Sequence, residues 1–420
     1  MKILLVTLYF PPAGGGGVQR PLKFATHLPT FGIETHVLAP TDTKWIHRDD
    51  ELLPPTQAWV HRVRYLGPKG RRPSEELHGT QGLERLATRA RLLPRRLVFP
   101  DEAATWNLTS IPAALRIARA EKIDAVVTTS PPGSVHLVGA ALKRSLGVPW
   151  IADLRDSLLA HQDRRADSLG VRMKSQTVRI VASTVARGAD AIVTAFDSIG
   201  EEMSALSPHG RVVTITNGSD FDDFAGLEYV PGDRFRVTHT GAFFGQRDPK
   251  PFLRALADSG LSDVTARFVG GFRAADREFA ESLGVLDQLE VIPFVPRRQS
   301  LELQRDSEAL LLIASEAGGR GTGVIPGKVF EYLAAERPIL AAVPVGGAAA
   351  QLIDELGAGV VAPEADAEAL RSALVELHGR WRRGELAVNL SAEQRARVDR
   401  RVKVEQLAEL LHEVAAKPKS

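Results

Sequence analysis

Short apolar runs alternate with segments of helical periodicity along almost the whole chain. In the first half, the apolar runs that we expect to be strands are residues 3–9, 34–39, 124–129, 150–154 and 191–195. Amphipathic segments separate them, for example at 18–31 and 135–146. This alternation is typical of a parallel sheet with helices on both faces. The sequence therefore predicts an α/β fold.

The pattern pauses near residue 207 and then starts again. One more strand is expected at 212–216, directly before the turn signal Asn217-Gly218. A second series of expected strands follows, at residues 236–240, 265–269, 289–293, 309–313 and 339–343. Because 420 residues exceed the size at which one core keeps growing, two domains are the natural expectation.

The predicted organisation is a pair of Rossmann-like, doubly wound parallel-sheet domains. They occupy residues 1–206 and 235–390, with a linker at 207–234. The amphipathic segment 391–420 is expected to form a C-terminal helix that can return to the N-terminal domain. Two such domains facing each other would leave a cleft at the carboxyl ends of their strands, where ligands of these folds bind.

Composition excludes several classes of function. The chain has no cysteine, which excludes disulfides, thiolate metal sites and a cysteine nucleophile and favours a cytoplasmic location. A formal charge of only +2 argues against general nucleic-acid binding. Since no run of about 20 apolar residues occurs, we expect no membrane-spanning helix.

One short basic segment is an exception to this balance. Five arginines are interleaved there with leucines, and they are Arg85, Arg89, Arg91, Arg95 and Arg96. Such a composition fits peripheral contact with the inner face of a membrane. It fits a solvated helix face equally well. Both interpretations stay open from the sequence.

Four consecutive glycines follow the first expected strand. Without side chains, their backbone N–H groups can approach a ligand closely. The dinucleotide fingerprint G-x-G-x-x-G is not present, and the second expected strand ends in Ala39-Pro40 instead of an acidic residue. Gly15, Gly16 and Gly17 are candidates for a ligand loop, with a flexible connector as the alternative.

A helix start after Pro326 is the most informative local feature. On a helical wheel, four apolar residues form one arc, and Lys328 and Glu331 lie on the other side; the apolar residues are Val329, Phe330, Leu333 and Ala334. Free N–H groups and the helix dipole at such a start attract phosphate. The alternative is an ordinary exposed Lys-Glu pair.

The same segment carries a resemblance to a known family. The run PGKVFEYLAAERPIL resembles the nucleotide-binding segment of GT-B glycosyltransferases of family 4, which are retaining enzymes with two Rossmann-like domains. Four more segments are similar to that family in the same order: PPAGGGGVQRPLKFATHL, SPPGSVHLVGAALKRSLGVPWIADLRDS, TITNGSDFDDF and THTGAFFGQRDPKPFL.

The resemblance implies a retaining enzyme of hexosyltransferase type. It would move a sugar from a nucleoside-diphosphate sugar, such as a UDP-sugar, to a hydroxyl of a glycan, a lipid-linked or a small-molecule acceptor. It would need neither a cofactor nor a metal. The N-terminal domain would bind the acceptor and the C-terminal domain the donor.

Donor-side residues follow from the matched motifs. Glu331 resembles the family's second glutamate, which accepts hydrogen bonds from the ribose hydroxyls, and the first glutamate would stand at Gly323, which is a departure from the family. Arg247 and Lys250 resemble the basic pair on the pyrophosphate, where fixed cations stabilise a leaving diphosphate. The remaining donor-side candidates are Gly241, Gly327, Lys328 and Val329.

Acceptor-side or sugar-side residues are expected in the N-terminal domain. Arg155 aligns with a histidine of many relatives, between Asp153 and Asp156. Because an arginine cannot act as a base near neutral pH, its role would be electrostatic or orienting. A structural Asp-Arg salt bridge is the alternative. His136 is a further candidate, although a lone histidine is often structural.

Two other functions remain compatible with the sequence. One is a sugar-nucleotide epimerase of the same fold, and the other is a non-catalytic sugar-nucleotide-binding partner. The glycine at position 323 makes the second conceivable. The acidic residues near 220 are interpreted as a turn of the linker and not as a cation site.

Overall fold

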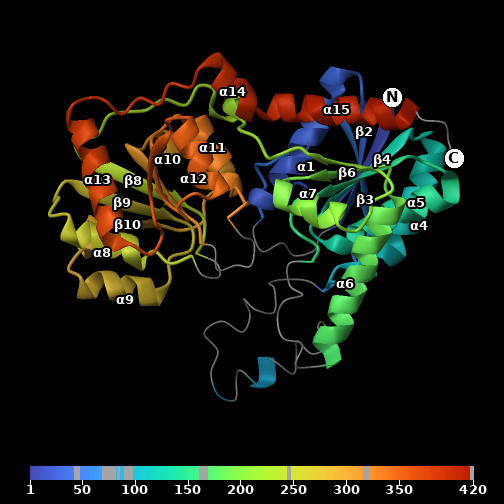
Figure 1. Ribbon diagram of the computed structural model, residues 1–420, viewed down its shortest axis with the longest axis horizontal. Helices are drawn as coiled ribbons and strands as arrows, with labels where there is room; N and C mark the ends of the chain where they lie inside the picture. The colour runs from blue at the N-terminus through green and yellow to red at the C-terminus, as the bar shows by residue number, and fades with distance from the viewer. Residues whose placement is uncertain are drawn as a thin grey trace. The chain divides into compact units, whose positions relative to one another are not determined.

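The computed structural model describes residues 1–41, 48–68, 82, 86–88, 98–159, 169–243, 247–315 and 322–416. It divides into two compact units (Figure 1). The first consists of Met1–Thr216 with Lys403–Ser420, and the second of Asn217–Val402. The arginines of the basic segment 85–96 lie outside the described residues.

The first unit has a seven-stranded parallel sheet in the order β3-β2-β1-β4-β5-β6-β7. Its strands are β1 (Lys2–Thr7), β2 (Glu34–Pro40), β3 (Ala58–Val63), β4 (Ala125–Ser130), β5 (Trp150–Leu154), β6 (Ala191–Thr194) and β7 (Arg211–Thr214). The order reverses between β1 and β4. This is the switch point at which ligands of doubly wound folds bind.

Helices cover both faces of this sheet. They are α1 (Gly16–His27), α4 (Asn107–Ala120), α5 (His136–Leu146), α6 (Leu169–Gly188) and α7 (Asp197–Ser204), with short 3-10 turns at Leu28–Phe31, Ala104–Trp106 and Gly133–Val135. The chain moves along the sheet in one direction through α1 and in the other through α5 and α6. Right-handed crossovers therefore place α1 on the opposite face from α5 and α6.

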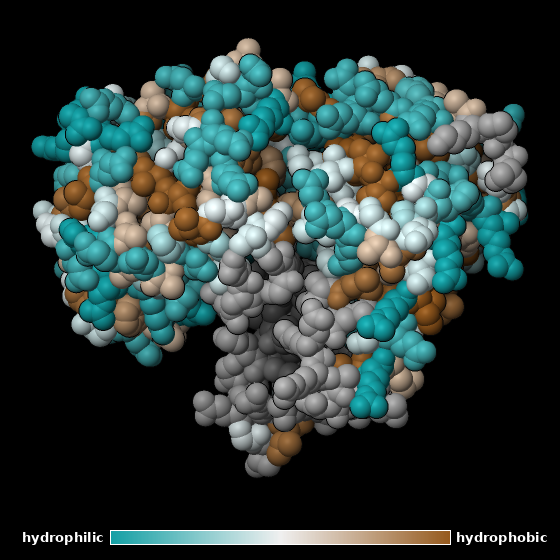
Figure 2. All heavy atoms as spheres, viewed as in Figure 1, coloured by the Kyte–Doolittle hydropathy of each residue, from teal (hydrophilic) through white to brown (hydrophobic). Residues whose placement is uncertain are grey.

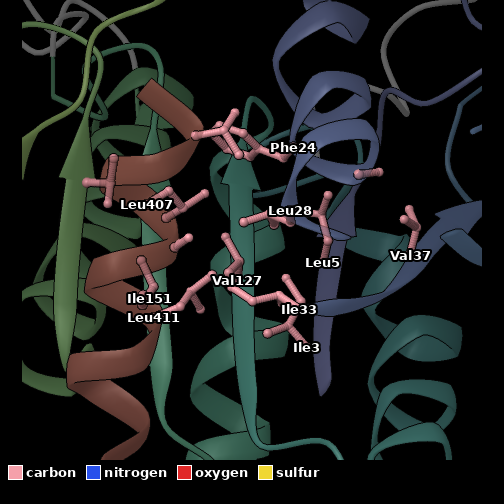
Figure 3. Packing of buried hydrophobic residues seen from close by; sticks show 14 of the residues in the cluster. Ile3, Leu5, Phe24, Leu28, Ile33, Val37, Val127, Ile151, Leu407 and Leu411 are labelled. Carbon is pink, nitrogen blue, oxygen red and sulfur yellow. The ribbon is translucent and has the colours of Figure 1, made fainter. Parts of the chain in front are cut away.

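The C-terminal helix completes the core on the face of α1. Figure 3 shows Leu407 and Leu411 of α15 (Arg400–Ala416) beside Ile151 and Val127 of the sheet. Leu28, in the turn after α1, lies beside Leu5 of β1, and Phe24 of α1 and Ile3 of β1 belong to the same cluster. The helix α14 (Ala392–Val398) precedes α15 and begins with a capping box between Ser391 and Gln394.

The second unit repeats the architecture with six parallel strands in the order β10-β9-β8-β11-β12-β13. They are β8 (Phe235–Thr240), β9 (Val264–Val269), β10 (Leu289–Ile292), β11 (Ala309–Ile313), β12 (Ile339–Ala342) and β13 (Gly359–Ala362). The helices are α8 (Lys250–Asp258), α9 (Ala274–Ser282), α10 (Arg297–Arg305), α11 (Gly327–Ala335), α12 (Ala348–Glu355) and α13 (Ala367–Arg382), and 3-10 turns lie at Phe221–Phe224 and Leu286–Gln288.

The predicted fold class, two doubly wound parallel-sheet units, is confirmed. The structure contains two strands, β3 and β13, that the sequence did not predict. Both lie at the edge of a sheet and are only partly buried, so they lack a long apolar run. In addition, β7 lies inside the range expected as a linker, and it pairs with β6 in the first sheet. The first unit therefore extends to Thr216.

Candidate functional site

The switch point of the second sheet brings two strand ends and one helix start together. β8 ends at Thr240, β11 ends at Ile313, and α11 begins directly after Pro326. The predicted helix is confirmed, including its buried arc of Val329, Phe330, Leu333 and Ala334. Lys328 and Glu331 both keep part of their surface exposed.

Tyr332 ties α11 to these strand ends. Its buried hydroxyl accepts a hydrogen bond from the Thr240 N–H at 3.1 Å and lies 3.4 Å from the Leu311 carbonyl, to which it donates. Burial raises the pKa of Tyr332 to about 12, so the hydroxyl keeps its proton. The first turn of α11 is thereby held against the carboxyl edge of the sheet.

Two glycines allow a close approach of the backbone at this edge. Gly241 has a φ of +105°, and a Cβ placed on it would lie 2.7 Å from the Lys328 Nζ. Gly270 has a φ of +118°, and its Cβ would lie 2.8 Å from the Gly241 carbonyl oxygen. Both positive φ values favour glycine, and Gly270 also requires it for space because its Cβ would meet backbone atoms. The Lys328 ammonium therefore rests against bare backbone.

A buried histidine holds this ammonium. The Nδ1 of His239 lies 2.9 Å from the Leu311 carbonyl oxygen, which can only accept, so Nδ1 carries the proton. The Nε2 is then an acceptor, and the Lys328 Nζ lies 3.3 Å from it. The ring also stacks on Phe243 with 4.5 Å between centroids. His239 thus fixes both the position and the direction of Lys328.

Arg247 adds a second positive charge nearby. Burial and then the charge of Arg247 lower the pKa of Lys328, whereas Glu331 raises it, and the net result is a pKa of about 7. Burial and the Lys328 charge also keep the pKa of His239 well below its usual value. An anion between the two cations would relieve their repulsion. This is the electrostatic signature of an anion site.

Lys250 lies in a different environment. It begins α8, and its ammonium lies 5.5 Å from the ring centroid of Phe279 in α9. This is a cation–π contact on the side of the sheet covered by α8 and α9. Of the two basic residues that the sequence paired, Arg247 is therefore the one that acts electrostatically on Lys328.

The Glu331 carboxylate is held by two partners that the sequence did not indicate. One oxygen accepts from the Arg297 Nη1 at 2.7 Å and the other from the Gln304 Nε2 at 2.6 Å. Arg297 also donates to Asp223 at 2.9 Å. Each carboxylate oxygen keeps a second lone pair, and the side chain remains 23% exposed. Glu331 is therefore a fixed acceptor that a hydroxyl could reach.

The segment directly before α11 also belongs to this edge of the sheet. Gly323 stands where the family has its first glutamate, and the chain before Thr322 back to residue 316 lies outside the described residues. The neighbouring Thr322 carbonyl accepts from the Ala348 N–H at 2.7 Å, at the start of α12. No cap by a side chain is found at the start of α11 within the described part of the chain.

In the first unit, Arg155 occupies the corresponding carboxyl edge. It follows β5 and is only 8% exposed, and it donates to the Ser130 carbonyl at the end of β4 and to the Gly17 carbonyl in the first turn of α1. Its Nη2 has no acceptor among the described residues. Burial lowers its pKa, while the charges of Asp153 and Asp156 raise it. Arg155 thus links the glycine loop to the switch point of the first sheet.

The glycine loop itself has open space around it. A Cβ placed on Gly15 or Gly16 would meet no heavy atom within 4 Å, and Gly15 has a φ of +88°. Gly17 instead approaches Tyr9 at 3.8 Å. The loop leads directly into α1, whose first residue is Gly16. Room for a ligand therefore exists next to these backbone N–H groups.

Asp153 forms an Asp-Arg salt bridge, but with a partner that the sequence did not indicate. It is fully buried, and its Oδ1 accepts from the Arg20 Nη2 at 2.7 Å. Its Oδ2 accepts from the Thr129 hydroxyl at 2.6 Å. Arg20 also donates to the Ile215 carbonyl at 2.8 Å. Both oxygens of the Asp153 carboxylate therefore have partners inside the core.

His136 is also an interior residue. Its Nδ1 lies 2.8 Å from the Thr128 hydroxyl, which in turn accepts from the Trp150 Nε1 at 2.8 Å. Burial lowers the pKa of His136 to about 4, so the ring is neutral near pH 7. It packs α5 against β4 and β5.

The acidic residues near 220 are paired with arginines. Asp220 binds Arg400 at 3.2 Å, and Asp222 binds Arg401 at 2.6 Å. Together with the Asp223–Arg297 contact, they anchor the 3-10 turn Phe221–Phe224. Across the described ranges, no group of three or more His, Asp or Glu side chains is placed to hold a metal ion.

Comparisons with known proteins agree with this architecture. A family model described as glycosyl transferase 4-like domain matches residues 15–218. No curated protein matches the chain. Solved structures with the same fold over nearly the whole chain include a sucrose-phosphate synthase from Thermosynechococcus elongatus, with a TM-score of 0.67, 13% identity and 99% of each chain covered.

Two further structures show the range of these neighbours. Anabaena HepE in complex with UDP has a TM-score of 0.63 and 16% identity, with 98% of this chain and 100% of that chain covered. The UDP-GlcNAc 2-epimerase from Neisseria meningitidis has a TM-score of 0.54 and 10% identity, with 99% of each chain covered. At such identities the likeness is one of fold. The chain therefore has the GT-B fold, and its residues 15–218 match the family model of a glycosyl transferase 4-like domain.

Proposed function

We propose that the protein is a retaining glycosyltransferase of hexosyltransferase type. It transfers a sugar from a nucleoside-diphosphate sugar to a hydroxyl of an acceptor. The observation that carries the proposal is the Lys328 ammonium, fixed by His239 at the start of α11 and repelled by Arg247. A diphosphate is the common biological anion that fits two cations and a helix start.

The donor would bind along α11. Its diphosphate accepts from Lys328, Arg247 and the first N–H groups of the helix, and its ribose hydroxyls donate to Glu331. Each charge-assisted hydrogen bond of this kind contributes about 1.5 to 3 kcal/mol. Anabaena HepE has been solved in complex with UDP-glucose, which favours a UDP-sugar as the first donor to test. GDP- and dTDP-sugars fit the same cations.

The chemistry follows from the charge that develops on the leaving group. The bond between the anomeric carbon and the diphosphate oxygen breaks, and the bond to the acceptor oxygen forms on the same face. The acceptor's proton passes to the departing phosphate oxygen, so no side-chain nucleophile is required. Lys328 and Arg247 stabilise the diphosphate as its negative charge grows. In this mechanism no metal is needed for that task.

Arg155 would act on the acceptor or on the transferred sugar. A guanidinium stays protonated near neutral pH, so it orients hydroxyl groups and does not accept a proton. Its remaining Nη2 donor and the space beside Gly15 and Gly16 support a subsite for sugar hydroxyls there.

The proposal is tested by donor binding and turnover together. We expect UDP and UDP-glucose to raise the melting temperature, because a ligand that binds only the folded state stabilises it. UDP release should need an acceptor, and EDTA should leave the rate unchanged. Loss of all activity in EDTA with recovery in magnesium or manganese would contradict the metal-free mechanism.

A sugar-nucleotide epimerase is the second candidate, favoured by the Neisseria epimerase among the structures of the same fold. An epimerase would convert the donor to its epimer with no acceptor present. A non-catalytic binding partner would bind the donor and release no UDP under any condition. Chromatography of the sugar nucleotides after incubation with and without acceptors separates the three functions.

A further inference from the structure

Positive charge is concentrated on three neighbouring helices of the first unit. α4, α5 and α6 contain no Asp or Glu, although the chain as a whole has a formal charge of only +2. α5 packs beside both α4 and α6. The basic residues of the three helices are Arg116, Arg119, Lys143, Arg144, Arg172, Lys174, Arg179 and Arg187. We refer to these residues with their exposed apolar neighbours as the α4–α6 surface.

Most of these charges face solvent. Seven of the eight basic residues are exposed, and Lys143, which pairs with Asp190 at 2.7 Å, is half-buried. Three large apolar side chains of the same helices are also exposed. Leu108 of α4 is 71% exposed, and Met173 and Ile180 of α6 are 46% and 57% exposed. Figure 2 shows hydrophilic and hydrophobic residues side by side along α6.

α6 presents these residues in two adjacent stripes. Its second half packs on the unit through Val181 and Val185, whereas the first half extends beyond α4 and α5 (Figure 1). Met173 and Ile180 are seven residues apart and so share one face, and Arg172 with Arg179 forms a parallel row beside them. An apolar row flanked by a basic row is typical of helices that lie in a membrane interface.

We infer that the α4–α6 surface docks on an anionic lipid bilayer. The arginines and lysines attract anionic headgroups, and Met173, Ile180 and Leu108 insert between them. A nucleic acid is less suitable as the partner, because α4, α5 and α6 contain no Phe, Tyr or Trp on which bases could stack. The exposed side chains that interrupt the charge are aliphatic, which suits acyl chains.

The position of this surface has a consequence for the acceptor. α6 follows β5 in the chain and runs back to β6, so its first half lies toward the carboxyl edge of the first sheet. Arg155 lies at that same edge. This deduction rests on the proposed glycosyl transfer. With α6 on a bilayer, a hydroxyl carried by a lipid anchor would reach the Arg155 subsite, so the acceptor class is lipid-linked.

Docking is tested by co-sedimentation of the full chain with phosphatidylcholine vesicles, with and without phosphatidylserine. The wild type should pellet only with the anionic vesicles, and high salt should release it because the charges are screened. Replacing Arg172, Lys174 and Arg179 by glutamine should weaken binding more than tenfold. The matched control replaces Arg380, Arg382 and Arg383 of the second unit by glutamine and should pellet like the wild type.

Three outcomes would overturn the inference. The first is that the wild type does not pellet with anionic vesicles at low salt. The second is that the α6 variant pellets like the wild type. The third is that neither form binds vesicles and the α6 variant binds RNA more weakly than the wild type. A further variant, with Arg91, Arg95 and Arg96 replaced by glutamine, should keep at least part of its binding. If it loses all binding while the α6 variant keeps it, the segment 85–96 is the membrane contact instead.

A donor measurement separates this inference from the proposed function. UDP-glucose binding by calorimetry should be the same for the wild type and the α6 variant, which confines the defect to docking. A chain that pellets with vesicles but binds no nucleotide sugar would refute the donor site and leave the docking surface intact. Replacing Met173 and Ile180 by glutamine should weaken binding and leave only the salt-sensitive part.

Discussion

The carboxyl edges of the two sheets share a topology but differ in their charge balance. In the second unit, burial and then the nearby charge of Arg247 lower the pKa of Lys328 to about 7. In the first unit, two buried cations, Arg20 and Arg155, are accompanied by two carboxylates, Asp153 and Asp156; burial lowers the pKa of Arg155, and both carboxylates raise it. A site with surplus positive charge favours an anion, whereas a balanced site favours neutral hydroxyls. In the proposed function, the diphosphate therefore binds to the second unit and the hydroxyl groups bind to the first.

Removing the second unit's surplus charge should have the largest effect. We expect Lys328→Ala to lower kcat about a hundredfold or more, because one fixed donor at a developing charge typically contributes 10²–10³. KM for the donor should change less, since the diphosphate gains charge only as its bond breaks. Steady-state kinetics with UDP-glucose measure both constants, with Arg382→Ala of the second unit as an exposed control.

Lys250→Ala sharpens this prediction. Lys250 was paired with Arg247 by sequence, but its ammonium lies over Phe279. We therefore expect a smaller loss of kcat for Lys250→Ala than for Arg247→Ala. Equal losses would mean that both side chains reach the diphosphate, and no loss in Lys328→Ala would remove the anion site from the second unit.

The next largest effect concerns the proposed ribose contact of Glu331. Glu331→Ala should weaken UDP binding about tenfold to a hundredfold, the equivalent of 1.5 to 3 kcal/mol. The variant should also unfold at a lower temperature, because Arg297 loses one of its two carboxylate partners. Calorimetry gives the affinity, and a UDP affinity unchanged from the wild type would show that Glu331 has only a structural role.

These two sites show what the sequence could and could not predict. The helix at Gly327–Ala335 and its buried arc follow from local periodicity, and most of the strands follow from short apolar runs. The partners of the site residues do not, because they come from distant parts of the chain. Arg297 is 34 positions from Glu331, and Arg20 is 133 positions from Asp153. Periodicity carries no information on such pairings.

His239 is a case in which a weak signal was present. It stands in a buried strand with two threonines, Thr238 and Thr240, which is an unusually polar end for an interior strand. Buried polar groups need partners, so this run indicated a site. Only the structure shows that the partners are the Leu311 carbonyl and Lys328. The edge strand Ala58–Val63 was missed for the opposite reason, since its partial exposure weakens the apolar pattern.

A pH dependence follows from the pKa of Lys328. Without a ligand, the ammonium loses its proton as the pH rises through about 7, and a bound diphosphate would restore its higher pKa. UDP-glucose affinity should therefore fall by up to tenfold per pH unit above neutrality. Its diphosphate has no proton to titrate in that range. In Lys328→Ala the slope should vanish, and a slope that persists would assign the titration to another group.

The smallest effect is expected for the donor affinity of a variant in the first unit. Arg155→Gln should change the UDP affinity by less than about threefold. In the proposed binding mode, the carboxyl edge of the first sheet does not contact the diphosphate. Turnover should nevertheless fall, with a raised KM for the acceptor. The variant lacks the guanidinium that orients hydroxyls, and the Gly17 carbonyl loses its donor.

Acid-induced unfolding supplies the control for the fold of that unit. The buried His136 has a pKa of about 4, below its usual value, so stability is lost as the pH falls through the window between the usual value and 4. Arg155→Gln should keep this acid transition, whereas His136→Gln should flatten it. If Arg155→Gln weakens UDP binding as strongly as Glu331→Ala does, the diphosphate contacts both units and the contrast between their two edges is wrong.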